Sequence, residues 1–287
     1  MKLLTIAIGM LAVAFLASGC GGGEAQSAGD VPTGERTTVP EPGDAKKYRV
    51  WLTRGEQLFA VMREGRAVPE LPIGEVMLAV QQLLGGPNAA EAAAGVGTAI
   101  PEGTRFRELK VDDGTATVDL TSEYESGGGS ASMFARLAQV VYTVTEFPSV
   151  ERVSFVLDGK PVDVFSGEGI VLEKPVTRAD YEELLPPILV ESPAIGAEVS
   201  NPVEVSGTAN VFEANVTGRV LDQNGKELVS RFTTATCGTG CRGRFSIELP
   251  YQVAVDQPGT LVLSDDDADG DGKPGFEVRI PVTISQG

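Results

Sequence analysis

One short stretch of this 287-residue chain has the pattern of a β-hairpin, and it reads Val111-Asp112-Asp113-Gly114-Thr115-Ala116-Thr117-Val118-Asp119-Leu120. An Asp-Gly pair between two apolar runs is one of the strongest short-range hairpin signals. Val118 and Leu120 are two residues apart, so their side chains face the same side of a strand. The stretch therefore predicts strands at residues 105–111 and 115–120.

An apolar pattern with helical spacing lies on each side of this hairpin. Residues 73–84 repeat apolar side chains at offsets of three, four and seven, and Gly85-Gly86-Pro87 ends the pattern. Residues 133–147 carry a longer pattern of the same kind, which ends before Pro148. Both segments are predicted to be helices, whereas the Ala- and Gly-rich residues 89–98 show no clear period and are predicted to be a loop.

Further strands are predicted at both ends of this region, at residues 48–52, 58–62, 153–157 and 162–164. The resulting order is β-β-α-β-β-α-β-β. It predicts an α+β domain over residues 46–168, with a mixed sheet that carries two helices on one face.

Several segments of this region resemble the GerMN domain, a sporulation and spore germination domain of bacterial envelope proteins. They are residues 83–87, 98–104, 111–120 and 138–143. The resemblance implies a scaffold or interaction module, and it supplies no catalytic residues to carry over.

The C-terminal part is predicted to be all-β. A charged connector, residues 169–186, precedes about 100 residues without helical period, residues 187–287. Seven short strands separated by turn signals are typical of an immunoglobulin-like sandwich. They are expected at residues 188–190, 203–206, 214–221, 227–234, 244–249, 260–263 and 277–284. The Cys-Trp-Cys pattern of antibody domains is absent, because Trp51 is the only tryptophan of the chain.

This second region is similar to the immunoglobulin-like domain of bacterial spore germination. The similarity rests on residues 191–193, 207–215, 236–241 and 277–282. That domain commonly follows a GerMN domain in bacterial lipoproteins, so the resemblance implies a binding or scaffolding role here as well.

The N-terminus has the features of a lipoprotein signal. Residues 1–19 contain one lysine and an apolar run of about 14 residues, which is too short to span a membrane. Small residues precede Cys20, as in a bacterial lipobox, although Ala17 stands where leucine is usual. We expect Cys20 to become the lipidated first residue of the mature chain. Residues 20–45 then form a Gly-, Ser- and Pro-rich tether that cannot bury enough surface to fold.

Cys237 and Cys241 are the other two cysteines of the chain. Outside the cytoplasm two cysteines this close are expected to oxidise, and Gly238 and Gly240 allow a tight loop to close. The alternatives to a structural disulfide are a redox-active cysteine pair and a metal-binding cysteine pair. The spacing is one residue too long for Cys-x-x-Cys, and no second Cys or His pair is available for zinc.

An acidic run at residues 265–272 is the candidate metal site. Asp265, Asp267, Asp269 and Asp271 alternate along it, and Gly270 and Gly272 permit a sharp turn, an arrangement that suits Ca²⁺. An EF-hand is excluded, because the two possible frames place phenylalanine and valine where glutamate is required. The alternative is a solvated acidic hairpin tip that discourages edge pairing.

The net charge and the lack of histidine exclude several classes of function. The formal net charge of −17 argues against nucleic-acid binding, and the absence of histidine excludes Ser-His-Asp and most catalytic zinc chemistry. We therefore expect a non-enzymatic lipoprotein on the extracytoplasmic face of the cell membrane. It would be anchored through Cys20 and would bind another envelope protein, with a link to sporulation or germination. The alternative is a Ca²⁺-dependent adhesion or carbohydrate-binding module in residues 187–287.

Overall fold

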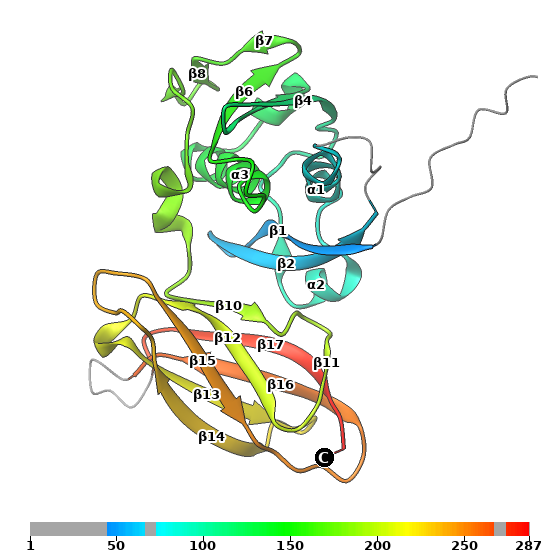
Figure 1. Ribbon diagram of the computed structural model, residues 1–287, viewed down its shortest axis with the longest axis vertical. Helices are drawn as coiled ribbons and strands as arrows, with labels where there is room; N and C mark the ends of the chain where they lie inside the picture. The colour runs from blue at the N-terminus through cyan, green and yellow to red at the C-terminus, as the bar shows by residue number, and fades with distance from the viewer. Residues whose placement is uncertain (1–44, 67–72, 267–273, 287) are drawn as a thin grey trace, which may run out of the picture. The chain divides into compact units, whose positions relative to one another are not determined.

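The computed structural model describes residues 45–66, 73–266 and 274–286 (Figure 1). Helices and strands are mixed in the first part of these residues, whereas the second part consists of strands apart from short 3₁₀ turns. The predicted α+β region followed by an all-β region is thus confirmed.

The α+β region contains two main sheets. The first has the strand order β2-β1-β3 and the second has the order β4-β5-β6-β7, in which only β5 and β6 run parallel. A separate pair, β8 and β9, follows. The strands are β1 (Lys46–Arg54), β2 (Gln57–Gly65), β3 (Val96–Gly97), β4 (Phe106–Asp112), β5 (Thr115–Leu120), β6 (Arg152–Leu157), β7 (Lys160–Pro161), β8 (Val164–Phe165) and β9 (Ile170–Val171).

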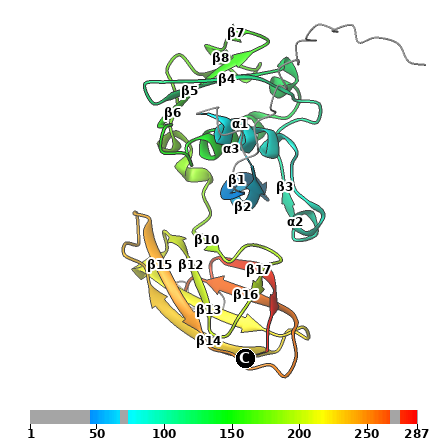
Figure 2. The same cartoon turned by 45° about the vertical axis from the view of Figure 1, so that its right-hand side comes forward.

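The two long helices, α1 (Gly74–Leu84) and α3 (Ser130–Val144), lie between these sheets (Figures 1 and 2). Each contacts strands of both sheets. The expectation of a single sheet is therefore corrected: the mixed sheet has the helices on one face, and a second sheet covers the helices from the other side. The reason lies in α3, which is buried at every position from Ala135 to Val144. A helix buried all round requires cover on both sides.

The predicted loop at residues 89–98 instead contains helix α2 (Ala89–Ala93) and strand β3. The side chain of Asn88 accepts the Glu91 backbone N–H at 2.9 Å, and the Glu91 carboxylate accepts the Asn88 N–H at 2.8 Å. This capping box fixes the start of the helix. Glu91 is also paired with Arg63 of β2, so local caps and a distant partner create a helix in a stretch without apolar periodicity.

The all-β region is a two-layered sandwich with strand orders β10-β12-β15 and β11-β17-β16-β13-β14. All seven predicted strands are present, and β11 is additional, since its two residues pair with the end of β17. The strands are β10 (Ile188–Ser192), β11 (Glu198–Val199), β12 (Val203–Ala209), β13 (Asn215–Leu221), β14 (Glu227–Thr234), β15 (Gly243–Leu249), β16 (Gln257–Ser264) and β17 (Glu277–Ile284).

Alternate residues of the strands form the core of this sandwich. In β15, for example, Phe245, Ile247 and Leu249 are buried, and the residues between them are exposed. This period of two is the one expected for a sheet with one face in the core and one in water. Between the two regions, the connector forms the 3₁₀ segment η2 (Arg178–Leu184).

Candidate functional site

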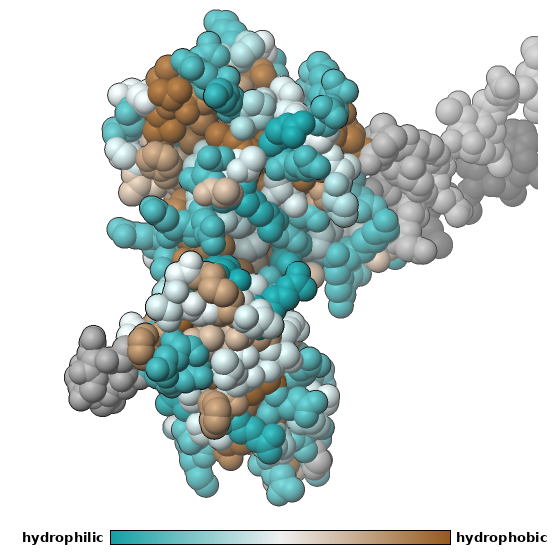
Figure 3. Space-filling view, turned by 60° about the vertical axis from the view of Figure 1, so that its left-hand side comes forward, coloured by the Kyte–Doolittle hydropathy of each residue, from teal (hydrophilic) through white to brown (hydrophobic). Residues whose placement is uncertain are grey.

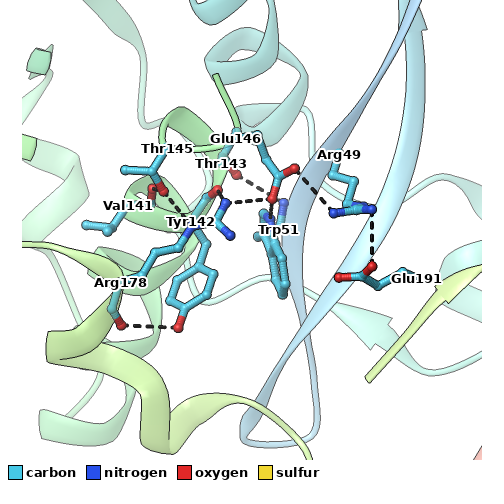
Figure 4. Close-up of polar contacts among 9 residues, drawn as sticks. All are labelled: Arg49, Trp51, Val141, Tyr142, Thr143, Thr145, Glu146, Arg178 and Glu191. Carbon is cyan, nitrogen blue, oxygen red and sulfur yellow. Dashed lines mark hydrogen bonds and ion pairs between the residues drawn. The ribbon is translucent and has the colours of Figure 1, made fainter. Parts of the chain in front are cut away.

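The carboxylate of Glu146, two residues beyond the end of α3, is the centre of a polar cluster (Figure 4). Its Oε1 atom accepts a hydrogen bond from Trp51 Nε1 at 3.0 Å and another from Arg178 Nη2 at 2.6 Å. Trp51 belongs to β1 and Arg178 to η2, so one carboxylate joins a strand, a helix end and the connector. The Glu146 side chain is 15% exposed, which strengthens these charged contacts.

Arg178 is held through the Nε and Nη2 atoms of its guanidinium group. Nε donates to Thr145 Oγ1 at 2.7 Å, and Nη2 also donates to the Tyr142 carbonyl at 2.9 Å. The guanidinium carbon lies 4.9 Å from the centre of the Tyr142 ring and 5.6 Å from that of Trp51. These distances are in the range of cation–π attraction. The connector is therefore fastened to the C-terminal end of α3.

The Tyr142 hydroxyl completes the cluster by donating to the Arg178 carbonyl at 3.1 Å. Burial raises the pKa of Tyr142 from its ordinary value of 10.0 to about 12, and the Arg178 charge opposes part of this rise. At neutral pH the phenol is thus protonated, and it serves as a hydrogen-bond donor.

Arg49 extends the cluster to the first strand of the sandwich. Its Nη1 atom lies 3.5 Å from Glu146 Oε2, and its Nη2 atom lies 3.4 Å from Glu191 Oε2 on β10. Two arginines thus face two glutamates, and the four charges balance. Because the carboxylates are occupied by cationic donors, this arrangement is suited to holding chain segments together and not to proton transfer or nucleophilic attack.

Sequence reasoning did not find this cluster, because Arg49, Glu146 and Arg178 are far apart in the chain and lie outside the segments that carry the family resemblances. One feature of the sequence did indicate that both faces of β1 are covered. Trp51 interrupts the alternation of Tyr48, Val50 and Leu52 in β1, and it is 2% exposed. A large aromatic residue on the second face of a strand indicates that this face is covered too.

The sulfur atoms of Cys237 and Cys241 lie within bonding distance of each other in the loop between β14 and β15, with the Cα atoms 5.8 Å apart. The loop packs closely on residues 210–214. Thr239 N–H donates to the Val211 carbonyl at 2.9 Å, and a Cβ atom on Gly238 would lie 2.5 Å from the Ala214 nitrogen. This geometry suits the predicted disulfide, whose presence in the cell stays a prediction that is tested below.

Asp265 is the only member of the candidate calcium set among the described residues, since Asp267, Asp269 and Asp271 lie outside them, as does Cys20. The Asp265 Oδ1 atom accepts the Phe276 N–H at 2.8 Å, and the Asp265 N–H donates to the Phe276 carbonyl at 3.2 Å. This carboxylate therefore helps to close the β16–β17 ladder. Within the described part of the chain, no group of three or more acidic, Cys or His residues could hold a metal ion.

In residues 45–66, 73–266 and 274–286, no helix is both long enough and apolar enough to cross a membrane.

Two protein-family models match this chain. Residues 53–163 match a family described as sporulation and spore germination, named Germane. Residues 187–271 match Gmad2, described as the immunoglobulin-like domain of bacterial spore germination. A search of curated proteins found no match.

Solved structures that match part of this chain include the first GerMN domain of the sporulation protein GerM from Bacillus subtilis. It is 20% identical, covers 47% of this chain and 99% of its own, and has a TM-score of 0.38. The tandem GerMN domains of the same protein are 13% identical over 71% of this chain and 61% of theirs, with a TM-score of 0.38. CopC from Methylosinus trichosporium OB3b is 18% identical over 34% of this chain and 94% of its own, with a TM-score of 0.25. The family matches cover the two regions in turn, and the chain carries a GerMN-type sporulation and spore germination domain followed by an immunoglobulin-like domain of bacterial spore germination.

Proposed function

We propose that this chain is a lipid-anchored protein of the extracytoplasmic face of the cell membrane, where it acts as a non-catalytic scaffold or interaction module linked to sporulation or germination. The observation that carries this proposal is the succession of two spore germination families in one chain. Neither family has a known catalytic role. The lipobox-like residues before Cys20 and the tether of residues 20–45 supply the anchor.

The polar cluster around Glu146 also supports a non-catalytic role. Its carboxylates are paired with arginines, and its tyrosine remains protonated at neutral pH. These groups stabilise the fold, and their contacts leave neither a free general base nor a free nucleophile in the cluster.

Exposed apolar side chains offer surfaces for a protein partner. Val164 of β8 and Val171 of β9 are directly opposite each other, and they are 54% and 62% exposed. Figure 3 shows apolar side chains gathered on the upper part of the face that it draws. Since single apolar residues are common on protein surfaces, a cross-strand pair of this exposure is the more informative feature.

The anchor is tested by metabolic labelling with an alkyne-tagged fatty acid. The wild-type chain should carry the label and should sediment with membranes, because two or three acyl chains give stable anchoring. Cys20→Ser should lose both properties. The matched control is the double variant Cys237→Ser/Cys241→Ser, which should keep both. A labelled Cys20→Ser chain would refute the anchor.

Ca²⁺-dependent adhesion or carbohydrate binding remains the alternative, and it rests on the spacing of the four aspartates. Calorimetric titration of the full chain with CaCl₂ separates this alternative from the scaffold role. Binding heat and a raised Tm that both vanish in Asp267→Asn/Asp269→Asn would favour the alternative. The absence of both in the wild-type chain would eliminate it.

A further inference from the structure

A cavity of about 300 Å³ lies where the β1–β2 turn, the end of the connector and the sandwich meet. This volume is at the lower end of the range of small-molecule sites. Its apolar wall comes mainly from β2, from the connector and β10, and from the start of β17. It includes Leu58, Phe59, Pro186, Ile188, Val190 and Val278.

The polar groups at this cavity are few, and their charges are not balanced. Glu277 already accepts hydrogen bonds from Arg219 and from Arg279. Arg54, in contrast, forms no ion pair with any of the described residues. Its Nη1 atom donates to the Arg279 carbonyl at 2.8 Å, and its guanidinium carbon lies 5.4 Å from the centre of the Phe59 ring.

Arg54 is half-buried at the edge of this cavity. Burial lowers its pKa from the ordinary value, with no other cause. The Phe59 ring and the Arg279 carbonyl are its contacts among the described residues, and they leave other N–H groups of the guanidinium able to donate. An anionic group in the cavity would supply the ion-pair partner that Arg54 lacks among the described residues. The planar guanidinium could donate two parallel N–H hydrogen bonds to such a group.

We propose that this cavity binds a small apolar molecule that carries one anionic group, with the apolar part between Phe59, Ile188 and Val278 and the anion on Arg54. The inference goes beyond the scaffold role and does not depend on it. Because the walls come from both regions of the chain, the bound molecule would contact the GerMN-type domain and the immunoglobulin-like domain together.

Two fluorescent probes that differ by one sulfonate test this proposal on the full chain. They are 8-anilinonaphthalene-1-sulfonate, which is anionic, and N-phenyl-1-naphthylamine, which is its neutral counterpart. We expect the anionic probe to bind at one site. Arg54→Gln should weaken it about tenfold, because a charge-assisted contact is lost, and should change the neutral probe by less than about twofold. Arg54→Lys should restore part of the affinity.

Two further variants make the test specific to the cavity. Gln57→Trp fills the rim with a larger side chain and should weaken both probes. Arg231→Gln removes a cation that does not line the cavity, and it should change neither probe. Circular dichroism and Tm verify that each variant is folded. Equal losses of the anionic probe in Arg54→Gln and Arg231→Gln, or full binding of both probes to a folded Gln57→Trp, would overturn the proposal.

Discussion

Arg178 Nη2 lies 2.6 Å from Glu146 Oε1, so the connector is ion-paired to the turn that follows α3. The same oxygen accepts the indole N–H of Trp51. A single carboxylate thereby fixes the chain at the point where it leaves the α+β region. Stability of this region should thus respond strongly to the charge at residue 146.

Glu146→Gln should lower the free energy of unfolding by about 1 to 3 kcal/mol, because it leaves Arg49 and Arg178 without their shared anion. The value is below that of a fully buried pair, since the Arg178 side chain is 38% exposed. Thermal unfolding should show a Tm about 3 to 10 °C lower. The matched control is Glu151→Gln, whose side chain is 75% exposed and which should change stability by less than about 0.5 kcal/mol. Equal effects of the two variants would contradict a central role of Glu146.

The cysteine pair is expected to be oxidised in the exported chain. Alkylation with iodoacetamide in denaturant should label neither Cys237 nor Cys241 unless a reductant is added first. Loop-closure entropy predicts that Cys237→Ser lowers the free energy of unfolding by about 2 kcal/mol. Adding Cys241→Ser to this variant should cost little more, because the bond is already lost. Two labels without reductant would show that the pair is reduced.

Tyr142 should make the protein less stable at high pH. The unfolded chain loses the phenol proton near pH 10, whereas the folded chain keeps it until about pH 12. In this window the folded state binds more protons, so the free energy of unfolding falls as the pH rises. The contribution is fully present below pH 10, and its loss amounts to about 2 to 3 kcal/mol.

The variant Tyr142→Phe isolates this contribution. At pH 7 it should be about 1 kcal/mol less stable than the wild type, because the hydrogen bond to the Arg178 carbonyl is lost. In urea unfolding at higher pH, this difference should shrink and then reverse. Parallel stability profiles of the two proteins from pH 8 to 12 would show that the Tyr142 pKa is not raised.

Glu91 is expected to hold α2 mainly through Arg63. Their side chains are 6% and 12% exposed, and Arg63 Nη2 lies 2.8 Å from Glu91 Oε2. Glu91→Ala should therefore cost about 3 kcal/mol or more. Asn88→Ala removes only a helix cap and should cost about 1 kcal/mol. If denaturant unfolding gives the same loss for both, the ion pair contributes nothing beyond the cap.

Local patterns were sufficient to predict most elements of the fold. The Asp113-Gly114 turn marks the β4–β5 hairpin, and the alternation in β15 marks a half-buried strand. These features depend on neighbours in sequence, so they can be read directly. The two-sheet arrangement could not be predicted in this way. It depends on the burial of α3 residues such as Ala138 and Gln139, which do not stand out in an apolar stripe.

The contacts of the polar cluster were beyond sequence reasoning for a similar reason. Arg49, Glu146 and Arg178 are separated by more than 30 residues from one another, and charged residues in such positions are mostly solvated. Arg54 is a comparable case. Its lack of an ion pair among the described residues follows from which carboxylates the fold leaves near it, and no property of the β1–β2 turn sequence indicates this.

Chemical crosslinking in living cells, followed by mass spectrometry of the purified chain, tests the proposed scaffold role most directly. One envelope protein should be recovered in every repeat, with crosslinks that map to residues 46–287. Cys20→Ser should lose this partner, because the chain leaves the membrane. Recovery of no reproducible partner from the anchored wild-type chain would contradict the scaffold role.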